Sequence, residues 1–374
     1  MASRPFLLHS TAATATSVRP FAEADIPQVA ALHRRVFRPV DGDPRLDTYR
    51  RYFSEVFLAA ARGRHVPASL VYERQGTIHG FLGVAPRRML FRRRPILMAV
   101  CSQFVVDPAV RGQVGLRLLK ACFDGTQDLT ISDESGDGTR RIWEWCGGDT
   151  VLPYSLRWVR PLRPAQYGVS LLARRSRLSL VARALAPEAR LFDAAAAALG
   201  GRGLVPRPPR GSREALHDAA FAAMMRELTE QSALRPDHDA RSAAWALARA
   251  GARPGYALLQ KLLVRNESRD AVGVILYCVG EDRIAEVLQV AARPDAINHV
   301  LDHLFEDATR RGAVAVAGRF EPALADALSR ARAVIHRGRH WTLLHSNDPE
   351  LRLAVHRGDA FLSRLEGEWC LRFP

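Results

Sequence analysis

The chain has 374 residues, a length that fits two or three domains of ordinary size and gives ample sequence for a hydrophobic core. Its formal net charge of +15 favours nucleic acid, anionic lipid or an acidic ligand as a partner, but nearly all of it is arginine in an alanine-rich chain, which coding bias also produces. No 18-residue apolar run, signal-peptide core or C-x-x-C pair occurs, so we expect a cytoplasmic protein that neither spans a membrane nor binds zinc.

The first clear elements are three strands. Pro67–Glu73 and Thr77–Val84 are joined by Arg-Gln-Gly, and Pro95–Val106 is a third segment rich in β-formers, so the three predict an antiparallel meander. Between the last two strands, the arginine-rich segment 87–94 is typical of a solvated hairpin tip, although such a tip could also reach a phosphate.

After the third strand, the chain passes through a proline into an Arg/Gly turn that opens an amphipathic helix, within Val105–Leu119. Backbone N–H groups at a helix start, with the positive end of the dipole behind them, attract an anion. Gly112 and Gly115 would let a ligand approach the backbone closely, so the turn predicts a phosphate site. The alternative is a turn that needs glycine at positive φ and binds nothing.

The meander, the V-x-P-x-x-R-G-Q turn and the following helix and strand resemble the GNAT superfamily of acyl-CoA-dependent N-acyltransferases. The resemblance covers roughly Ser17–Leu162 and implies a first strand at Ser17–Phe21 and helices at Asp25–Phe37 and Asp47–Ala61. Relatives usually have R-G-x-G-x-G or R-G-x-G-x-A at the turn, whereas this chain reads Arg-Gly-Gln-Val-Gly-Leu, as if one glycine were deleted or replaced by Val114.

The resemblance implies an acyl-CoA site along this strand and turn. Pyrophosphate would lie on the amides from Gly112 to Gly115, and the strand before the turn would pair with pantetheine as an added strand. An amide of that strand's end would polarise the thioester oxygen. The implied cofactor-binding residues are Phe104, Val105, Val106, Arg111, Gly112, Gln113, Val114 and Gly115, with acetyl-CoA or another acyl-CoA as co-substrate.

Acyl transfer to an amine is helped by a base that takes the amine's proton and an acid that protonates the leaving thiolate. The strand before the turn holds no carboxylate, so Asp133 and Glu134, at the end of the next strand, are the candidate bases; they could instead cap the following helix. Relatives often supply a tyrosine as the acid, where this chain has Trp143. Tyr154 and Cys146 are the candidate replacements, and either could instead be a packed side chain.

Two patterns that could bind a metal are less specific than the motifs above. Asp133, Ser135, Asp137, Gly138 and Glu144 match positions of a calcium-binding EF-hand loop, but the preceding segment is predicted as a strand and an EF-hand follows a helix. Histidines recur at 336, 340 and 345 without a carboxylate or cysteine at ligand spacing. His299 and His303 are four residues apart on a predicted helix and could chelate a metal, but such histidines more often face solvent. We therefore expect no metal site.

The second half repeats the order of elements. After a helical connector, it predicts helices at 212–230 and 238–250, strands at 256–264, 271–279 and 284–291, a helix at 296–311 and a strand at 314–318. No R-G-x-G turn accompanies them, so this half resembles a degenerate GNAT repeat. We expect an α/β (α+β) protein with mixed sheets flanked by helices, divided into a flexible N-terminus (1–16), a GNAT domain (17–164), a connector and linker (165–211) and a second, degenerate GNAT-like domain (212–374).

The sequence thus predicts an acyl-CoA-dependent N-acyltransferase that acts on an amine by direct attack in a ternary complex. The acceptor could be a small molecule, an amino sugar or a peptide; nucleic acid is not expected. Two alternatives stay open: an acyl-CoA-binding protein without catalysis, and a Fem-like aminoacyl transferase whose basic surface serves an aminoacyl-tRNA.

Overall fold

The computed structural model of the chain describes residues 16–37, 45–59, 66–173, 178–199 and 208–374. The predicted flexible N-terminus, apart from its last residue, and much of the predicted linker at 200–207 lie outside these residues. The chain divides into two compact units. Unit 1 holds residues 1–85 and 101–126, and unit 2 holds residues 86–100 and 127–374.

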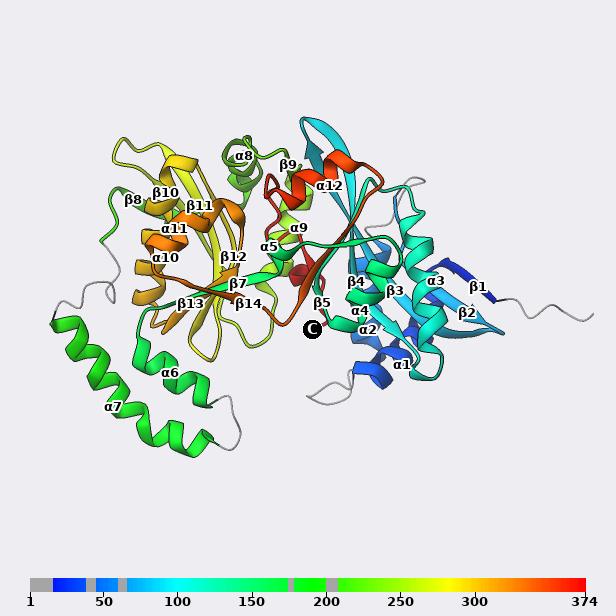
Figure 1. The fold of residues 1–374 in the computed structure, drawn as a ribbon, viewed down its shortest axis with the longest axis horizontal. Coiled ribbons are helices and arrows are strands. Elements are labelled where there is room, and N and C mark those ends of the chain that lie inside the picture. Colours follow the sequence, from blue (N-terminus) through cyan, green and yellow to red (C-terminus); the bar gives the residue numbers. More distant parts are fainter. Residues whose placement is uncertain (1–15, 38–44, 60–65, 174–177, 200–207) are drawn as a thin grey trace, which may run out of the picture. The chain divides into compact units, whose positions relative to one another are not determined.

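Unit 1 is built from strands covered by helices around an aromatic core (Figure 1). Strand β2 pairs antiparallel with β1 on one side and with β3 on the other. Edge-to-face contacts join Phe21, Phe53, Phe57 and Phe81, all of which are buried. The elements are β1 (Thr16–Pro20), α1 (Ile26–Phe37), α2 (Leu46–Phe53), a π-helical turn (Ser54–Leu58), β2 (Leu70–Arg74), the first part of β3 (Thr77–Phe91), the last part of β4 (Arg94–Val106) and α3 (Arg111–Phe123).

Unit 2 contains a small mixed sheet that begins with the first residues of β4. These residues, Met98–Val100, pair in parallel with Leu129–Ile131 of β5. Strand β15 pairs antiparallel with both β5 and β6, and β9 pairs with the end of β3. The elements are β5 (Leu129–Ser135), α4 (Asp137–Trp145), β6 (Asp149–Thr150), α5 (Leu152–Ser155), β9 (Leu234–Pro236), β15 (Trp341–His345) and α12 (Pro349–His356).

Over the described residues, a second sheet of unit 2 runs in the order β14-β7-β13-β12-β11-β10-β8. Its pairs are antiparallel except for β12 with β13. In chain order the strands are β7 (Leu156–Pro161), β8 (Ser212–Ala215), β10 (Gln260–Arg265), β11 (Ala271–Val279), β12 (Ile284–Ala292), β13 (Ala315–Arg319) and β14 (Val334–Arg337).

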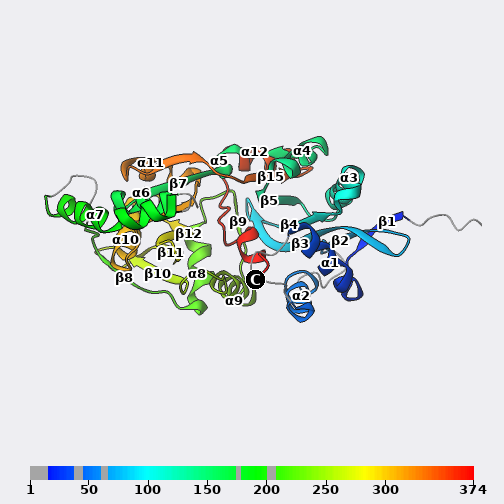
Figure 2. The same cartoon turned by 90° about the horizontal axis from the view of Figure 1, so that it is seen from below.

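Both faces of this sheet are buried, and side chains alternate between them. Ile275 and Tyr277 pack with α10, whereas Val274 and Leu276 pack with α8 and α9. Figure 2 shows α6 and α7 beside this sheet, where they lie against each other and Asp193 accepts hydrogen bonds from the N–H groups of Ala165 and Gln166. The helices are α6 (Pro164–Ala173), α7 (Ser179–Ala198), α8 (Asp218–Leu228), α9 (Ala240–Gly251), α10 (Ile297–Arg310) and α11 (Ala325–Arg330).

The two sheets of unit 2 exchange strands (Figure 1). Strand β7, which precedes the predicted boundary at residue 164, lies between β14 and β13 of the second sheet. Strand β15, from the last part of the chain, lies between β5 and β6 of the small sheet. The prediction of an α/β fold with mixed sheets flanked by helices is confirmed, but the strands do not follow the chain order that a simple tandem repeat would give.

Two local predictions differ from the structure. Strand β3 continues to Phe91, so the turn consists of Arg92 and Arg93, which have φ of 48° and 69°. Arg87 lies within the strand, with its guanidinium 4.6 Å from the ring centroid of Trp245. The helix expected at 212–230 is preceded by β8, because the backbone of Ser212–Ala215 pairs with β10.

None of the helices in the described part of the chain combines the length and the apolar character that crossing a membrane requires.

Candidate functional site

The predicted phosphate turn is the first turn of α3. A short 3₁₀ turn at Pro108–Val110 leads into the helix, which begins at Arg111. Asp107 fixes this entry, because its carboxylate accepts the N–H of Ala109 at 3.1 Å and pairs with Arg35 at 2.9 Å. The side chain of Arg111 lies outside the described part of the structure.

The glycines of this turn are not required by backbone conformation. Neither Gly112 nor Gly115 is among the described residues with positive φ, and a Cβ at Gly112 would meet nothing within 4 Å. Gly112 and Gln113 are exposed. The first N–H groups of a helix have no partner inside it, so those of this exposed turn are accessible to a ligand or to water.

Val114, which stands where relatives often have glycine, has a structural partner. It is 3% exposed, and a Cβ on Gly80 of β3 would lie 2.7 Å from its Cγ1 and 2.8 Å from Leu118. The valine side chain therefore occupies the space left by a glycine on the neighbouring strand, and helix and strand still approach closely.

The last residues of β4 follow a break in the strand. Gln103 has φ of 52°, and its side-chain oxygen lies 2.9 Å from Nε2 of His33. After it, Phe104 and Val106 are half-buried and Val105 is buried. The predicted cofactor-binding residues of unit 1 thus lie on one strand end and on the first turn and a half of the helix that follows it.

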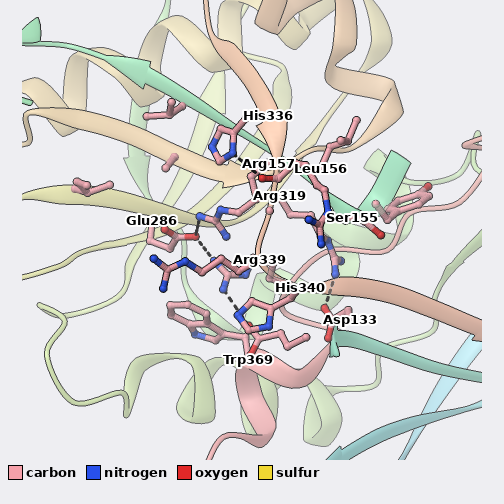
Figure 3. Close-up of a pocket in the computed structure, with 18 of the residues that line it drawn as sticks. Asp133, Ser155, Leu156, Arg157, Glu286, Arg319, His336, Arg339, His340 and Trp369 are labelled. Carbon is pink, nitrogen blue, oxygen red and sulfur yellow. Dashed lines mark hydrogen bonds and ion pairs between the residues drawn. The ribbon is translucent and has the colours of Figure 1, made fainter. Parts of the chain in front are cut away.

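Unit 2 contains a cavity of about 840 Å³, and all three predicted catalytic residues, Asp133, Glu134 and Tyr154, line it. Figure 3 shows Asp133 in its wall. This volume is in the range of small-molecule sites. Cys146, the alternative acid, is not among the lining residues. The cofactor-binding candidates belong to unit 1.

Asp133 is held at the end of β5 on both carboxylate oxygens. It pairs with Arg319, and it accepts the N–H of Glu368 at 2.7 Å. A Cβ on Gly367 would lie 2.0 Å from the Asp133 carboxylate, so only glycine fits beside it. In return, Glu368 accepts the N–H groups of Asp133 and Glu134 at 3.0 Å each. These hydrogen bonds hold the last segment of the chain against β5.

Glu134 lies between two guanidinium groups. Nη2 of Arg364 is 3.1 Å and Nε of Arg372 is 2.6 Å from its oxygens. Burial opposes ionisation of this carboxyl, but the two arginines outweigh it and lower its pKa to about 2. Glu134 is therefore an anion at every physiological pH.

Tyr154 of α5 is 1% exposed, and its hydroxyl donates to the backbone oxygen of Ala360 at 2.5 Å. Burial and the nearby Glu321 carboxylate raise the pKa of this phenol above its usual value. Trp143, which the resemblance set in place of an acid tyrosine, is also buried and donates from Nε1 to the oxygen of Leu344 at 2.8 Å.

Several cavity residues were missed by the sequence analysis. His336 and His340 were considered only as metal ligands, but they lie in the cavity wall with neighbouring arginines. Arg157 and Arg319 come from strands β7 and β13. The available signal was an arginine at the end of an apolar strand, as in Ala-Val-Ala-Gly-Arg319, which seldom belongs to a purely structural sheet.

Comparisons with protein-family models and with curated protein sequences find no match. Solved structures do match. A probable N-acyltransferase from Enterococcus faecalis has a TM-score of 0.57 at 10% identity, with 89% of this chain and 72% of that one covered. A GCN5-related N-acetyltransferase from Anabaena variabilis gives 0.57 at 12%, covering 89% and 73%, and one from Kribbella flavida gives 0.54 at 14%, covering 89% and 71%.

These identities are too low to transfer activity, but the coverage extends over both halves of the chain. The chain therefore has the fold of the GCN5-related N-acetyltransferase (GNAT) superfamily.

Proposed function

We propose that the protein is an acyl-CoA-dependent N-acyltransferase, with acetyl-CoA as the simplest co-substrate. The observation that carries this proposal is the first turn of α3, which presents exposed backbone at Gly112 and Gln113 directly after β4 in a GNAT fold. A helix start of this kind suits the pyrophosphate of CoA.

The N–H groups of Arg111, Gly112 and Gln113 are the best donors for that pyrophosphate, because those of Val114 and Gly115 fall deeper in the helix and bond within it. Val114 and Gly115 would instead keep the helix close to β3. Phe104, Val105 and Val106 would carry the pantetheine on their backbone, and an amide of Val105 or Val106 would polarise the thioester oxygen.

The amine would attack the thioester directly while both substrates are bound. The new C–N bond forms as the C–S bond breaks, the amine loses a proton and the thiolate gains one. Because Glu134 has a pKa of about 2, it is a weak base. We therefore propose that Asp133 and Glu134 hold the ammonium group and that its proton leaves through water. Tyr154 could donate to the thiolate only after releasing the oxygen of Ala360.

Calorimetric titration of acetyl-CoA and a longer acyl-CoA tests the cofactor site. Wild type should bind one equivalent, and Gly112→Glu should lose binding, because a carboxylate then faces the phosphates. The variant should stay folded, since the position is open and an acidic residue in the first turn of a helix is favourable. Absence of binding by the wild type would refute the transferase.

Release of the CoA thiol on addition of amines then separates an enzyme from a protein that only binds acyl-CoA. Tyr154→Phe is the informative variant in this assay. An acid role predicts a fall in kcat of about a hundredfold or more. A structural role predicts a lower melting temperature with kcat nearly unchanged.

A further inference from the structure

The cavity of unit 2 is strongly cationic. Of its described lining residues, seven are arginines and four are aspartate or glutamate, which leaves three positive charges in excess with the histidines neutral. The aromatic rings of Tyr256 and Trp369 lie in the same wall. A cavity of this composition raises the local concentration of anions.

Three of the four carboxylates in the cavity wall, those of Asp133, Glu134 and Glu286, have cationic partners. Asp133 pairs with Arg319, and Glu134 pairs with Arg364 and Arg372. Glu286 is shared by Arg157 and Arg364, with Nη2 of Arg157 at 2.5 Å. The single ammonium group of an acceptor would have to share Asp133 or Glu134 with an arginine, and a polycationic ligand would meet this competition at each of these three carboxylates.

Two other arginines of the wall, Arg253 and Arg339, have no carboxylate partner among the described residues. No ion pair or hydrogen bond involves the guanidinium of Arg253 or of Arg339 within the described residues. Arg253 stacks on Trp369, 3.6 Å from the ring centroid, and on Tyr256 at 5.0 Å, so its planar group is held in place by two rings. Arg339 is exposed at the cavity (Figure 3).

Among the described residues of the wall, the buried side-chain atoms that lack a hydrogen-bond partner are all donors. In the described part of the chain, the buried side-chain atoms of the lining residues that lack a partner are Nη1 of Arg253, Nε of Arg319 and Nε1 of Trp369. Buried polar groups are normally satisfied. A ligand rich in acceptor oxygens would complement all three donors. An ammonium group would not, because it has only donors itself.

We propose that the cavity binds an acceptor amine that also carries a carboxylate or phosphate group, with this anion on Arg253 and Arg339 and the ammonium on the side of Asp133 and Glu134. Arg253, Arg339, Asp133 and Glu134 all line this one cavity, so both charged groups of a small zwitterion would have partners within it. The inference deepens the proposed function, since it names the substrate class of the same transferase. Polyamines and polycationic amino sugars are excluded as preferred acceptors.

Four amino sugars test this assignment by calorimetry in the absence of acyl-CoA. Glucosamine, glucosamine 6-phosphate and muramic acid share one amine and differ in having no anion, a phosphate or a carboxylate; kanamycin is the polycation. We expect the phosphate or the carboxylate compound to bind at least about tenfold more tightly than glucosamine, and the preference to weaken as salt is raised. The better of the two identifies the anion.

Arg253→Gln and Arg339→Gln should each remove most of that preference while binding of glucosamine changes little. Arg330→Gln, an exposed arginine of α11 outside the cavity, is the matched control and should behave as wild type. Equal affinity for glucosamine and its anionic derivatives, or tightest binding of kanamycin, would overturn the assignment. Anion-dependent binding without acyl-CoA binding would keep the cavity assignment and refute the transferase alone.

Discussion

Glu368 is a carboxyl group placed where ionisation is costly. It is buried against β5, and burial together with the charges of Asp133 and Glu134 raises its pKa from 4.5 to about 8. Its Oε1 nevertheless accepts two backbone N–H groups and the hydroxyl of Ser132 at 2.6 Å. The residue thus clasps the last segment to β5 and keeps its proton at neutral pH.

This arrangement makes stability depend on pH. Between pH 4.5 and 8 the unfolded chain releases the Glu368 proton while the folded chain keeps it, so the free energy of unfolding falls as pH rises. Glu368→Gln keeps the accepting oxygen and removes the titration. We expect the free energy of unfolding of the variant to rise relative to that of wild type as pH increases across this window, by at most about 1.4 kcal/mol per pH unit. Urea unfolding at several pH values measures this difference.

Glu281→Gln is the control for this series, because Glu281 is exposed and its loss should leave the pH profile unchanged. Parallel profiles for Glu368→Gln and wild type would show that Glu368 is ionised in the folded protein and that its three donors outweigh burial.

Among the elements, α3 and β3 are joined by the contact of Val114 with Gly80. Gly80→Ala should destabilise the protein by about 1–3 kcal/mol, because the added methyl group meets Val114 and Leu118 at less than van der Waals distance. Val114→Gly should cost roughly 2 kcal/mol through lost burial and lower helix propensity.

The double variant should be more stable than the sum of the single changes predicts, by at least about 1 kcal/mol, because the new methyl group then no longer meets Val114 and has only Leu118 to displace. Chemical denaturation of the four proteins measures this coupling. Strict additivity would mean that the chain relaxes at Gly80 and that the contact does not set the distance between helix and strand.

The sequence predicted local elements well and their partners poorly. Strands β2 and β4 and the helix α3 follow from β-former runs and from the turn at Pro108, because short-range patterns determine them. The exchange of β7 and β15 depends on pairing between residues far apart in the chain, which no local pattern encodes. The extension of β3 was hidden by its arginines, one of which stacks on Trp245.

At the candidate site, the sequence identified Asp133, Glu134 and Tyr154, and the structure brings these three to one cavity. It missed Arg253 and Trp369, because their stacking joins residues more than a hundred positions apart. The catalytic and cofactor roles stay predictions, since the fold alone does not test them.

For the molecule as a whole, strand exchange predicts that neither half folds alone. Residues 1–211 lack β15, which leaves β5 and β6 without their shared neighbour, and residues 212–374 lack β7, the partner of β13 and β14. Each half expressed separately should be insoluble or show little amide protection in hydrogen exchange. The halves co-expressed from two genes should assemble into a soluble, protected pair.

A half that is soluble and protected without its partner would contradict this expectation and would mean that the exchanged strand is dispensable.

The insertion of β15 between β5 and β6 also has a consequence for synthesis on the ribosome. Strands β5 and β6 end about two hundred residues before the strand that joins them begins, so at ordinary elongation rates their edges stay unpaired for about ten seconds or more. During that interval, a nascent-chain chaperone could bind the unpaired edges of Leu129–Ser135 and Asp149–Thr150.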